Sequence, residues 1–363
     1  MIFDLAIIGG GPSGAAAAIT AANSGARVLL LERGRLPRHK VCGEFISSDG
    51  VTLLAHLGLN YLLDAAPRLG SARIFAGGSV AVFPLNPAAV AVSRYALDNG
   101  LWERALSAGA DCRQQFEAHA ISGYGPFVIT TSTGAVTARS VINASGRWSN
   151  LRRSALSRRT TDKWIGLKAH FREEQSAESV DLYFFAGGYC GVQPLGTAHI
   201  NTCAMVRSDA ASSVDDVPRL HDALADRSQT WQRVSEAVAT SPLIFAPPEP
   251  EEGGVLFAGD AAGFIDPFVG DGISLALRSG IMAALSLAHF WRGERSLSEA
   301  AAEYRSHYER ELRPLFRNSG WLRRLTSIPK SLHRPVMALL RAPGVMSCLV
   351  SKTRASPGDL PVI

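Results

Sequence analysis

The sequence predicts an α/β protein: a Rossmann-like dinucleotide-binding domain, interleaved with an antiparallel-sheet domain and followed by a helical C-terminal tail. Three observations predict this arrangement. A glycine-rich loop follows the first apolar run, at residues 9–14. Residues 164–206 then read as several short strands separated by glycine turns. A second apolar run with its own glycine-rich loop begins at residue 255, so the dinucleotide-binding part is expected to be interrupted and then to resume.

The N-terminal stretch carries a complete dinucleotide fingerprint. Residues 3–8 predict a buried strand, the Ala-rich residues 13–24 a helix, and residues 27–31 a second strand that leads into Glu32. Glycines with the spacing G-x-G-x-x-G permit the tight turn, the approach of a pyrophosphate and close helix–strand packing, and they are Gly9, Gly11 and Gly14. Glu32 lies 18 positions after Gly14, where a carboxylate accepts hydrogen bonds from a ribose.

The remaining elements follow in order. The predicted helices lie at residues 93–108, 215–239, 274–290 and over most of 298–350, and a hairpin turns at Thr133-Gly134 before a short strand at 140–144. We therefore expect residues 1–160 and 250–297 to bind the dinucleotide, 161–249 to form a β-rich substrate-binding domain, and 298–363 to form the helical tail. Residues 45–92 are assigned to the dinucleotide-binding part, and the alternative is that they join the substrate-binding domain.

Composition excludes several classes of protein. The chain is 47% hydrophobic and 19% charged, as expected of a globular protein, and the net charge of +5 comes from scattered basic residues. We therefore expect no nucleic-acid partner. The five cysteines form no C-x-x-C pair, and no metal site is expected. With no secretion signal and no apolar run long enough to cross a bilayer, the chain is predicted to be cytoplasmic; membrane-surface contact through the apolar residues 335–350 is an alternative that is not favoured.

The second glycine-rich loop indicates which dinucleotide is bound. It reads VLFAGDAAGFIDPFVGDGISLALRSG from residue 255, and its strand delivers Asp260 at the edge where open α/β sheets bind ligands. A helix beginning near Ile273 can direct its positive end at a ligand. FAD is longer than NAD and must be held at both ends, so two such loops favour FAD.

These motifs resemble the FAD-dependent oxidoreductases of the para-hydroxybenzoate-hydroxylase fold, and most closely the geranylgeranyl-reductase-like branch. The resemblance rests on GGGPSG with LLLERG, PRHKVCGEF, INASGRWSNLRR and the second glycine-rich loop. It implies that the cofactor contacts are Gly9, Gly11, Pro12, Ser13, Gly14, Glu32, Arg33, Lys40, Cys42, Gly43, Arg94, Ala144, Ser145, Gly146, Asp260, Pro267, Gly270, Asp271, Gly272 and Ile273. The sequence departs from the branch at Asp271, where the reductases often have Glu, and at residues 143–146.

Candidate catalytic residues lie beside the expected position of the flavin. Cys42 and Glu44 belong to the PRHKVCGEF motif, and the resemblance places them near the flavin, as thiol and carboxyl candidates for proton transfer. Three histidines are weaker candidates for a general acid, namely His39, His170 and His199. The expected substrate pocket is lined by Tyr183, Phe185, Tyr189 and Gln193.

Two reactions fit these residues. The sequence favours a monooxygenase that hydroxylates an aromatic or polyketide-like molecule with NAD(P)H and oxygen, because Gln193-Pro194-Leu195 replaces a segment typical of the lipid reductases. Reduction of a carbon–carbon double bond is the alternative, and a flavin-dependent halogenase is disfavoured. In each case the substrate is a hydrophobic small molecule. NAD(P)H binds transiently as the electron donor, or a partner reductase supplies the electrons.

Overall fold

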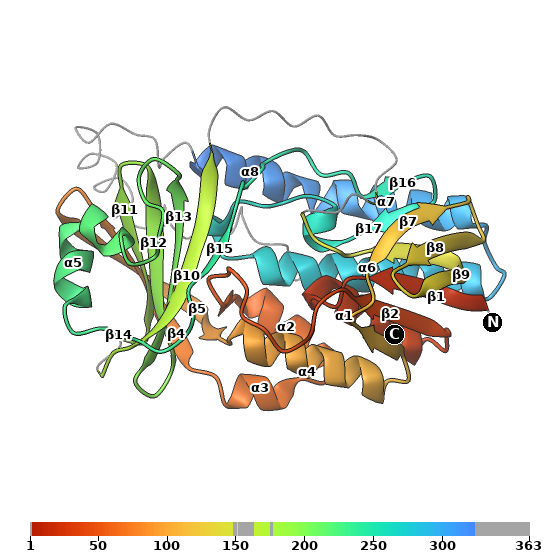
Figure 1. The fold of residues 1–363 in the computed structure, drawn as a ribbon, viewed down its shortest axis with the longest axis horizontal. Coiled ribbons are helices and arrows are strands. Elements are labelled where there is room, and N and C mark those ends of the chain that lie inside the picture. Colours follow the sequence, from red (N-terminus) through yellow and green to blue (C-terminus); the bar gives the residue numbers. More distant parts are fainter. Residues whose placement is uncertain (1, 148–150, 152–162, 175–176, 324–363) are drawn as a thin grey trace.

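Two β-sheets lie at opposite ends of the molecule, with helices between and around them (Figure 1). The computed structural model describes residues 2–147, 151, 163–174 and 177–323. In Figure 1 the sheet that contains the N-terminal strand is on the right, and the sheet formed mainly by the middle of the chain is on the left. The fold is the α/β arrangement that the sequence predicts.

The first sheet is built around the N-terminal strand β1, in the order β16-β17-β9-β1-β2-β6. Its strands are β1 (Ile2–Ile8), β2 (Val28–Glu32), β6 (Asp111–Gln114), β7 (Ala118–Ser122), β8 (Phe127–Thr131), β9 (Gly134–Asn143), β16 (Glu251–Glu252) and β17 (Val255–Phe257), with β7 and β8 extending from β9. Strands β6, β2, β1, β9 and β17 run parallel. Their carboxyl ends therefore meet at one edge, which brings the loops at residues 9, 144 and 259 together although they are far apart in sequence.

The second sheet is mostly antiparallel, in the order β14-β10-β13-β12-β11-β4-β5-β3, with β15 also on β10. Its strands are β3 (Phe45–Ile46), β4 (Arg68–Ala76), β5 (Ser79–Ala91), β10 (Trp164–Arg172), β11 (Ser179–Phe185), β12 (Gly188–Gly196), β13 (His199–Arg207), β14 (Gln232–Arg233) and β15 (Val238–Thr240). The segment 68–91 thus contributes β4 and β5 to this sheet, and β4 pairs in parallel with β11. The domain boundaries given above stay a prediction.

The helices cover the first sheet and the outer face of the second. They are α1 (Pro12–Asn23), α2 (Ser48–His56), α3 (Asn60–Asp64), α4 (Arg94–Ser107), α5 (Asp222–Ser228), α6 (Gly272–Trp291), α7 (Leu297–Glu311) and α8 (Arg313–Arg323), with 3-10 turns η1 (Val217–Leu220), η2 (Gly259–Ala261) and η3 (Pro267–Val269). Among the described residues, α6 alone is long and apolar enough to cross a membrane, and 83% of its most apolar window is buried. It is a core helix that packs against α1.

One predicted helix is wrong. Residues 215–239 form η1 and the short α5, and then the strands β14 and β15. Both strands pair with β10, whose outer edge would otherwise leave backbone groups without partners, and this pairing overrides the local preference for helix. In the predicted tail, α7 and α8 are helical to Arg323. The rest of the tail, including residues 335–350, lies outside the described residues.

Candidate cofactor and substrate site

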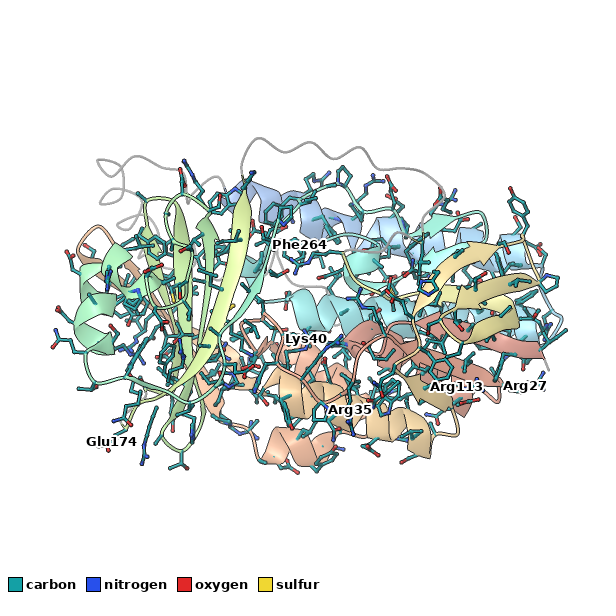
Figure 2. All side chains as sticks on the ribbon, viewed as in Figure 1. Arg27, Arg35, Lys40, Arg113, Glu174 and Phe264 are labelled. Atoms are coloured by element: carbon teal, nitrogen blue, oxygen red, sulfur yellow. The ribbon has the colours of Figure 1, made fainter. Side chains whose placement is uncertain are left out.

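A cavity of about 820 Å³ lies between the carboxyl edge of the first sheet and one face of the second sheet. Figure 2 shows Lys40 and Phe264, which both line it, between the two sheets, whereas Arg27 and Arg113 lie away from it on the first sheet. Of the predicted cofactor contacts, the cavity is lined by Gly9, Gly11, Pro12, Ser13, Glu32, Arg33, Lys40, Cys42, Gly43, Arg94, Ala144, Ser145, Gly146, Asp260, Pro267, Gly270, Gly272 and Ile273. Gly14 and Asp271 are buried behind this surface. The cofactor-binding role of each residue stays a prediction.

The N-terminal glycine loop is shaped to admit a phosphate. Gly9 has φ +109°, and a Cβ there would lie 2.3 Å from the Ala144 carbonyl oxygen. A Cβ on Gly14 would lie 1.9 Å from the Gly9 backbone oxygen, so only glycine at position 14 allows the helix to pack this closely on the loop after β1. Helix α1 has no side-chain cap at Gly11, and the buried Ser13 hydroxyl at its first turn has no partner. Free N–H groups and an unpartnered hydroxyl at a helix N-terminus fit a pyrophosphate.

Glu32 is held in place at the end of β2. Its carboxylate accepts hydrogen bonds from the Gly10 and Gly34 backbone N–H groups at 2.9 and 2.8 Å and from Arg38 at 2.9 Å. A carboxylate has about four acceptor positions, so one stays available for a ribose hydroxyl. The sequence analysis missed Phe116 and His119, which line the same end of the cavity from the segment after β6.

The second glycine-rich loop supplies the opposite wall. The Asp260 side chain is 36% exposed and lies 3.6 Å from the Arg147 guanidinium, which also stacks 4.2 Å above the Phe264 ring. Desolvation raises the pKa of Asp260, against the opposing charges of Arg147 and Arg94. Helix α6 begins at Gly272 and directs its N-terminus toward the cavity, as the sequence predicts.

Two cations near the glycine loop share one buried carboxylate. Asp98 is fully buried and binds Lys40 at 2.8 Å and Arg94 at 2.8 and 2.9 Å. Burial would raise the pKa of Asp98, but Arg94 and Lys40 outweigh it and hold that pKa below its usual range. The Cys42 side chain also contacts the Arg94 guanidinium. Burial would lower the pKa of Arg94, but Asp98 and Cys42 outweigh burial and raise that pKa. The sequence analysis missed Asp98, although Arg94 and Asp98 have the i,i+4 spacing of a helical ion pair.

Glu44 is bound on all sides by donors. Its carboxylate accepts hydrogen bonds from the Lys168 ammonium at 2.5 Å and the Arg94 backbone N–H at 2.7 Å, and it lies 2.7 Å from His170 Nε2. Burial would raise the pKa of Glu44, but His170 and Lys168 outweigh it and hold the pKa below its usual range. An ionised carboxylate with these partners is not arranged to donate a proton. This geometry suits a positioning residue better than the proton-transfer residue that the sequence predicts.

The predicted substrate residues divide between the two faces of the second sheet. Tyr189 and Gln193 line the cavity. Tyr183 and Phe185 do not, and this corrects the prediction: they lie in the core on the outer face of the sheet, where Tyr183 stacks on Phe75. Because side chains alternate along a strand, it is Leu182 of β11 that reaches the cavity instead.

The other polar candidates lie in different surroundings. His39 lines the cavity and its ring lies edge-on to His170, with ring centroids 5.0 Å apart. His199 is exposed at the start of β13. Asn201 donates hydrogen bonds to the Cys42 and Gly43 carbonyl oxygens at 3.2 and 2.8 Å. Among the described residues, no group of three or more His, Cys, Asp or Glu side chains could hold a metal ion.

The chain is similar to known oxidoreductases. The family model for FAD dependent oxidoreductases matches residues 4–57. The chain is 28% identical to digeranylgeranylglycerophospholipid reductase 2 of Methanopyrus kandleri, over 87% of this chain and 85% of the relative. It is also 28% identical to the menaquinone reductase of Mycolicibacterium smegmatis, over 77% of this chain and 75% of the relative.

Solved structures share the fold. A geranylgeranyl bacteriochlorophyll reductase-like protein of Thermoplasma acidophilum superposes with a TM-score of 0.77 at 21% identity, over 97% of this chain and 95% of that one. A flavin-dependent brominase superposes with a TM-score of 0.79 at 17% identity, over 97% and 93%. The protein is an FAD-dependent oxidoreductase, with FAD as its cofactor. Its relatives within that class include the geranylgeranyl-reductase-like branch.

Proposed function

We propose that this protein reduces a carbon–carbon double bond in an apolar small molecule, with NAD(P)H as the electron donor. The observation that carries the proposal is the position of Cys42: its thiol lines the cavity, contacts Arg94, and follows the loop that approaches the dinucleotide site. A double-bond reduction needs a proton for the carbon that does not receive the hydride, and the Cys42 thiol can supply it. The two reductases named above match most of the chain and support the same choice.

The part of the cavity formed by the second sheet suits an apolar substrate. Aliphatic side chains from four strands face it, and they are Ala72, Ile74, Leu85, Val180, Leu182 and Met205. Leu243, Phe264 and Phe268 line it from the loops that follow β15 and η2. Such a wall excludes water from the reacting carbons and gains free energy by burying an apolar chain, at about 25 cal/mol per Å².

The residues have separate roles in this reaction. Reduced FAD held by the residues at this site would supply a hydride to one carbon of the double bond. Cys42 donates its thiol proton to the other carbon, so the alkene becomes an alkane and a thiolate is left. The Arg94 guanidinium stabilises that thiolate, and solvent protonates it again before the next turnover. NAD(P)H, or a partner reductase, would supply the electrons. We place the reaction in the cytoplasm.

Hydroxylation, which the sequence favours, is the second candidate. Gln193 lines the cavity and belongs to the segment Gln193-Pro194-Leu195, which departs from the segment typical of the lipid reductases, and this departure supports a substrate other than a long isoprenoid. A halogenase has less support, because the two lysines close to the cavity in the described chain, Lys40 and Lys168, are each paired with a buried carboxylate.

Anaerobic turnover separates the two candidates. The holoenzyme is incubated with NADPH and either a geranylgeranyl lipid or a menaquinone, with and without oxygen, and products are identified by mass spectrometry. We expect a product that has gained two hydrogens, formed equally well without oxygen. A product that has gained an oxygen atom, and that forms only in air, would contradict the proposal.

A further inference from the structure

A buried ion cluster joins the Cys42 loop to the second sheet. Glu44 lies two residues after Cys42, while Lys168 and His170 stand on β10, more than a hundred positions away in sequence. The side chains of Glu44 and Lys168 are 0% and 1% exposed, and that of His170 is 10% exposed. The cavity mechanism described above uses none of these three groups directly.

The backbone at Glu44 is held in a conformation that only a few side chains adopt. Its φ is +58°, in the left-handed region that residues other than glycine seldom adopt. The Glu44 N–H points at the Cys42 sulfur, 3.4 Å away, while the Glu44 carboxylate accepts the Arg94 backbone N–H. The strained turn is thus fixed by α4 and β10 together, and it determines where the Cys42 thiol lies.

Titratable groups lie on every element packed around the Cys42 loop. Helix α4 contributes Arg94 and its partner Asp98, strand β10 contributes Lys168 and His170, strand β13 contributes the Cys203 thiol, and the loop itself contributes His39, Lys40 and Glu44. The negative charge of Glu44 offsets the positive charge of Lys168, and the Asp98 carboxylate is shared by Arg94 and Lys40. Removing one member of the first pair therefore leaves one uncompensated charge beside the loop that carries the thiol, where the Glu44 N–H lies 3.4 Å from the Cys42 sulfur.

We propose that Glu44 and Lys168 are positioning residues that set how readily the Cys42 thiol ionises, through opposite charges held in balance beside it. The proposal rests on the proposed function only in assigning Cys42 as the proton donor. Loss of Glu44 leaves a cation, which favours the thiolate. Loss of Lys168 leaves an anion, which disfavours it. A cluster that merely packed the loop would shift both variants in the same direction.

The test measures the rate at which iodoacetamide alkylates Cys42 in the oxidised holoenzyme between pH 6 and 11, with the modified peptide identified by mass spectrometry. Cys190 reacts little in this range, because burial raises its pKa to about 12. We expect Glu44→Gln to lower the midpoint of the rate profile by about one pH unit and Lys168→Met to raise it by about one unit. The double variant Glu44→Gln/Lys168→Met should return it to within about 0.3 unit of wild type.

Matched controls are Glu103→Gln and Lys163→Met, which remove exposed charges of the same two types and should leave the midpoint unchanged. The proposal is overturned if both single variants shift the midpoint in the same direction, or if the midpoint of the double variant does not return to the wild-type value. It is also overturned if neither single variant shifts the midpoint. If Glu44→Gln does not fold, the midpoint of Lys168→Met is compared with that of the double variant, and a lower midpoint in the double variant shows the effect of removing Glu44. Alkylation needs no turnover, so these outcomes are independent of the anaerobic test of the proposed function.

Discussion

The two faces of the second sheet each bury a carboxylate between basic side chains. On the cavity face, Glu44 binds Lys168 and His170. On the outer face, Asp181 of β11 binds Arg73 at 2.6 Å and Arg227 at 2.5 Å. The two carboxylates are similarly buried, and both clusters join segments that are distant in sequence.

The difference lies in what the clusters touch. Glu44 contacts the loop of Cys42 and the first residue of α4, and both of these line the cavity. The neighbours of Asp181 are Ser179 and, through Arg227, Glu173 and Tyr183, and none of these lines the cavity. A buried ion cluster is therefore not itself a sign of function. Its position relative to the cofactor and substrate decides which cluster bears on the reaction.

The largest expected effect is on folding. Glu44→Ala should lower the free energy of unfolding of the holoenzyme by about 3–5 kcal/mol, because it leaves the Lys168 ammonium buried without a counter-charge. Asp181→Ala should cost less, because Arg73 is about a third exposed and Arg227 keeps its bond to Glu173. Urea unfolding measures both. Glu103→Ala, at an exposed position, should change the value by no more than about 0.5 kcal/mol, and equal losses in Asp181→Ala and Glu44→Ala would remove the distinction.

The next effect concerns the cofactor. Arg94→Met should weaken FAD binding by about 10- to 100-fold, because a charged hydrogen-bond donor beside the glycine loop is lost. Arg73→Met removes an arginine of the outer-face cluster and should leave FAD affinity unchanged. Titration of the apoprotein with FAD, followed by flavin fluorescence, gives both constants. A loss of affinity in Arg73→Met as large as in Arg94→Met would show that the effect is not local to the cavity.

Stability should also depend on pH through Glu44. Its pKa in the folded protein is lower than the ordinary 4.5, so its contribution is present above pH 4.5 and is lost as the pH falls below that value toward the folded-state pKa. We expect the unfolding free energy of wild type to decline below about pH 4.5, and Glu44→Gln to show a shallower decline. Denaturation curves between pH 3 and 7 test this; identical slopes for the two proteins would argue against an ionised, paired Glu44.

The smallest expected effect is at Tyr183. Tyr183→Phe removes a hydrogen bond of 3.1 Å from Arg227 on the outer face and should cost about 1 kcal/mol of stability. Because the ring does not line the cavity, kcat/KM should stay within about twofold of wild type. Removing the hydroxyl of Tyr189, which lines the cavity, provides the matched comparison. A large loss of activity in Tyr183→Phe would reverse the assignment of the two faces.

The cofactor half of the site could be predicted because its signals are local. The strand, glycine loop and helix around Gly9 and Gly11 lie within a few dozen residues, and their geometry follows from backbone sterics and helix N-terminal N–H groups. The second loop at Asp260 could be placed beside the first because parallel strands end at one edge of the sheet.

The substrate half depends on long-range pairing that a single sequence does not reveal. Which face of β11 meets the cavity follows from its pairing with β4 and β12, and without that register Tyr183 was placed on the wrong face. The Glu44–Lys168 pair forms only when β10 crosses the Cys42 loop. A lysine within the apolar run IGLKAHF was the one available sign that a buried partner exists.

The central claim is that Cys42 protonates the substrate, and single-turnover kinetics test it most directly. The holoenzyme is reduced anaerobically with NADPH, mixed with the lipid or quinone that it converts, and flavin reoxidation is followed by absorbance. For Cys42→Ser we predict normal reduction by NADPH and reoxidation by substrate slowed at least about 100-fold. Reoxidation at the wild-type rate, with the same saturated product, would contradict the account.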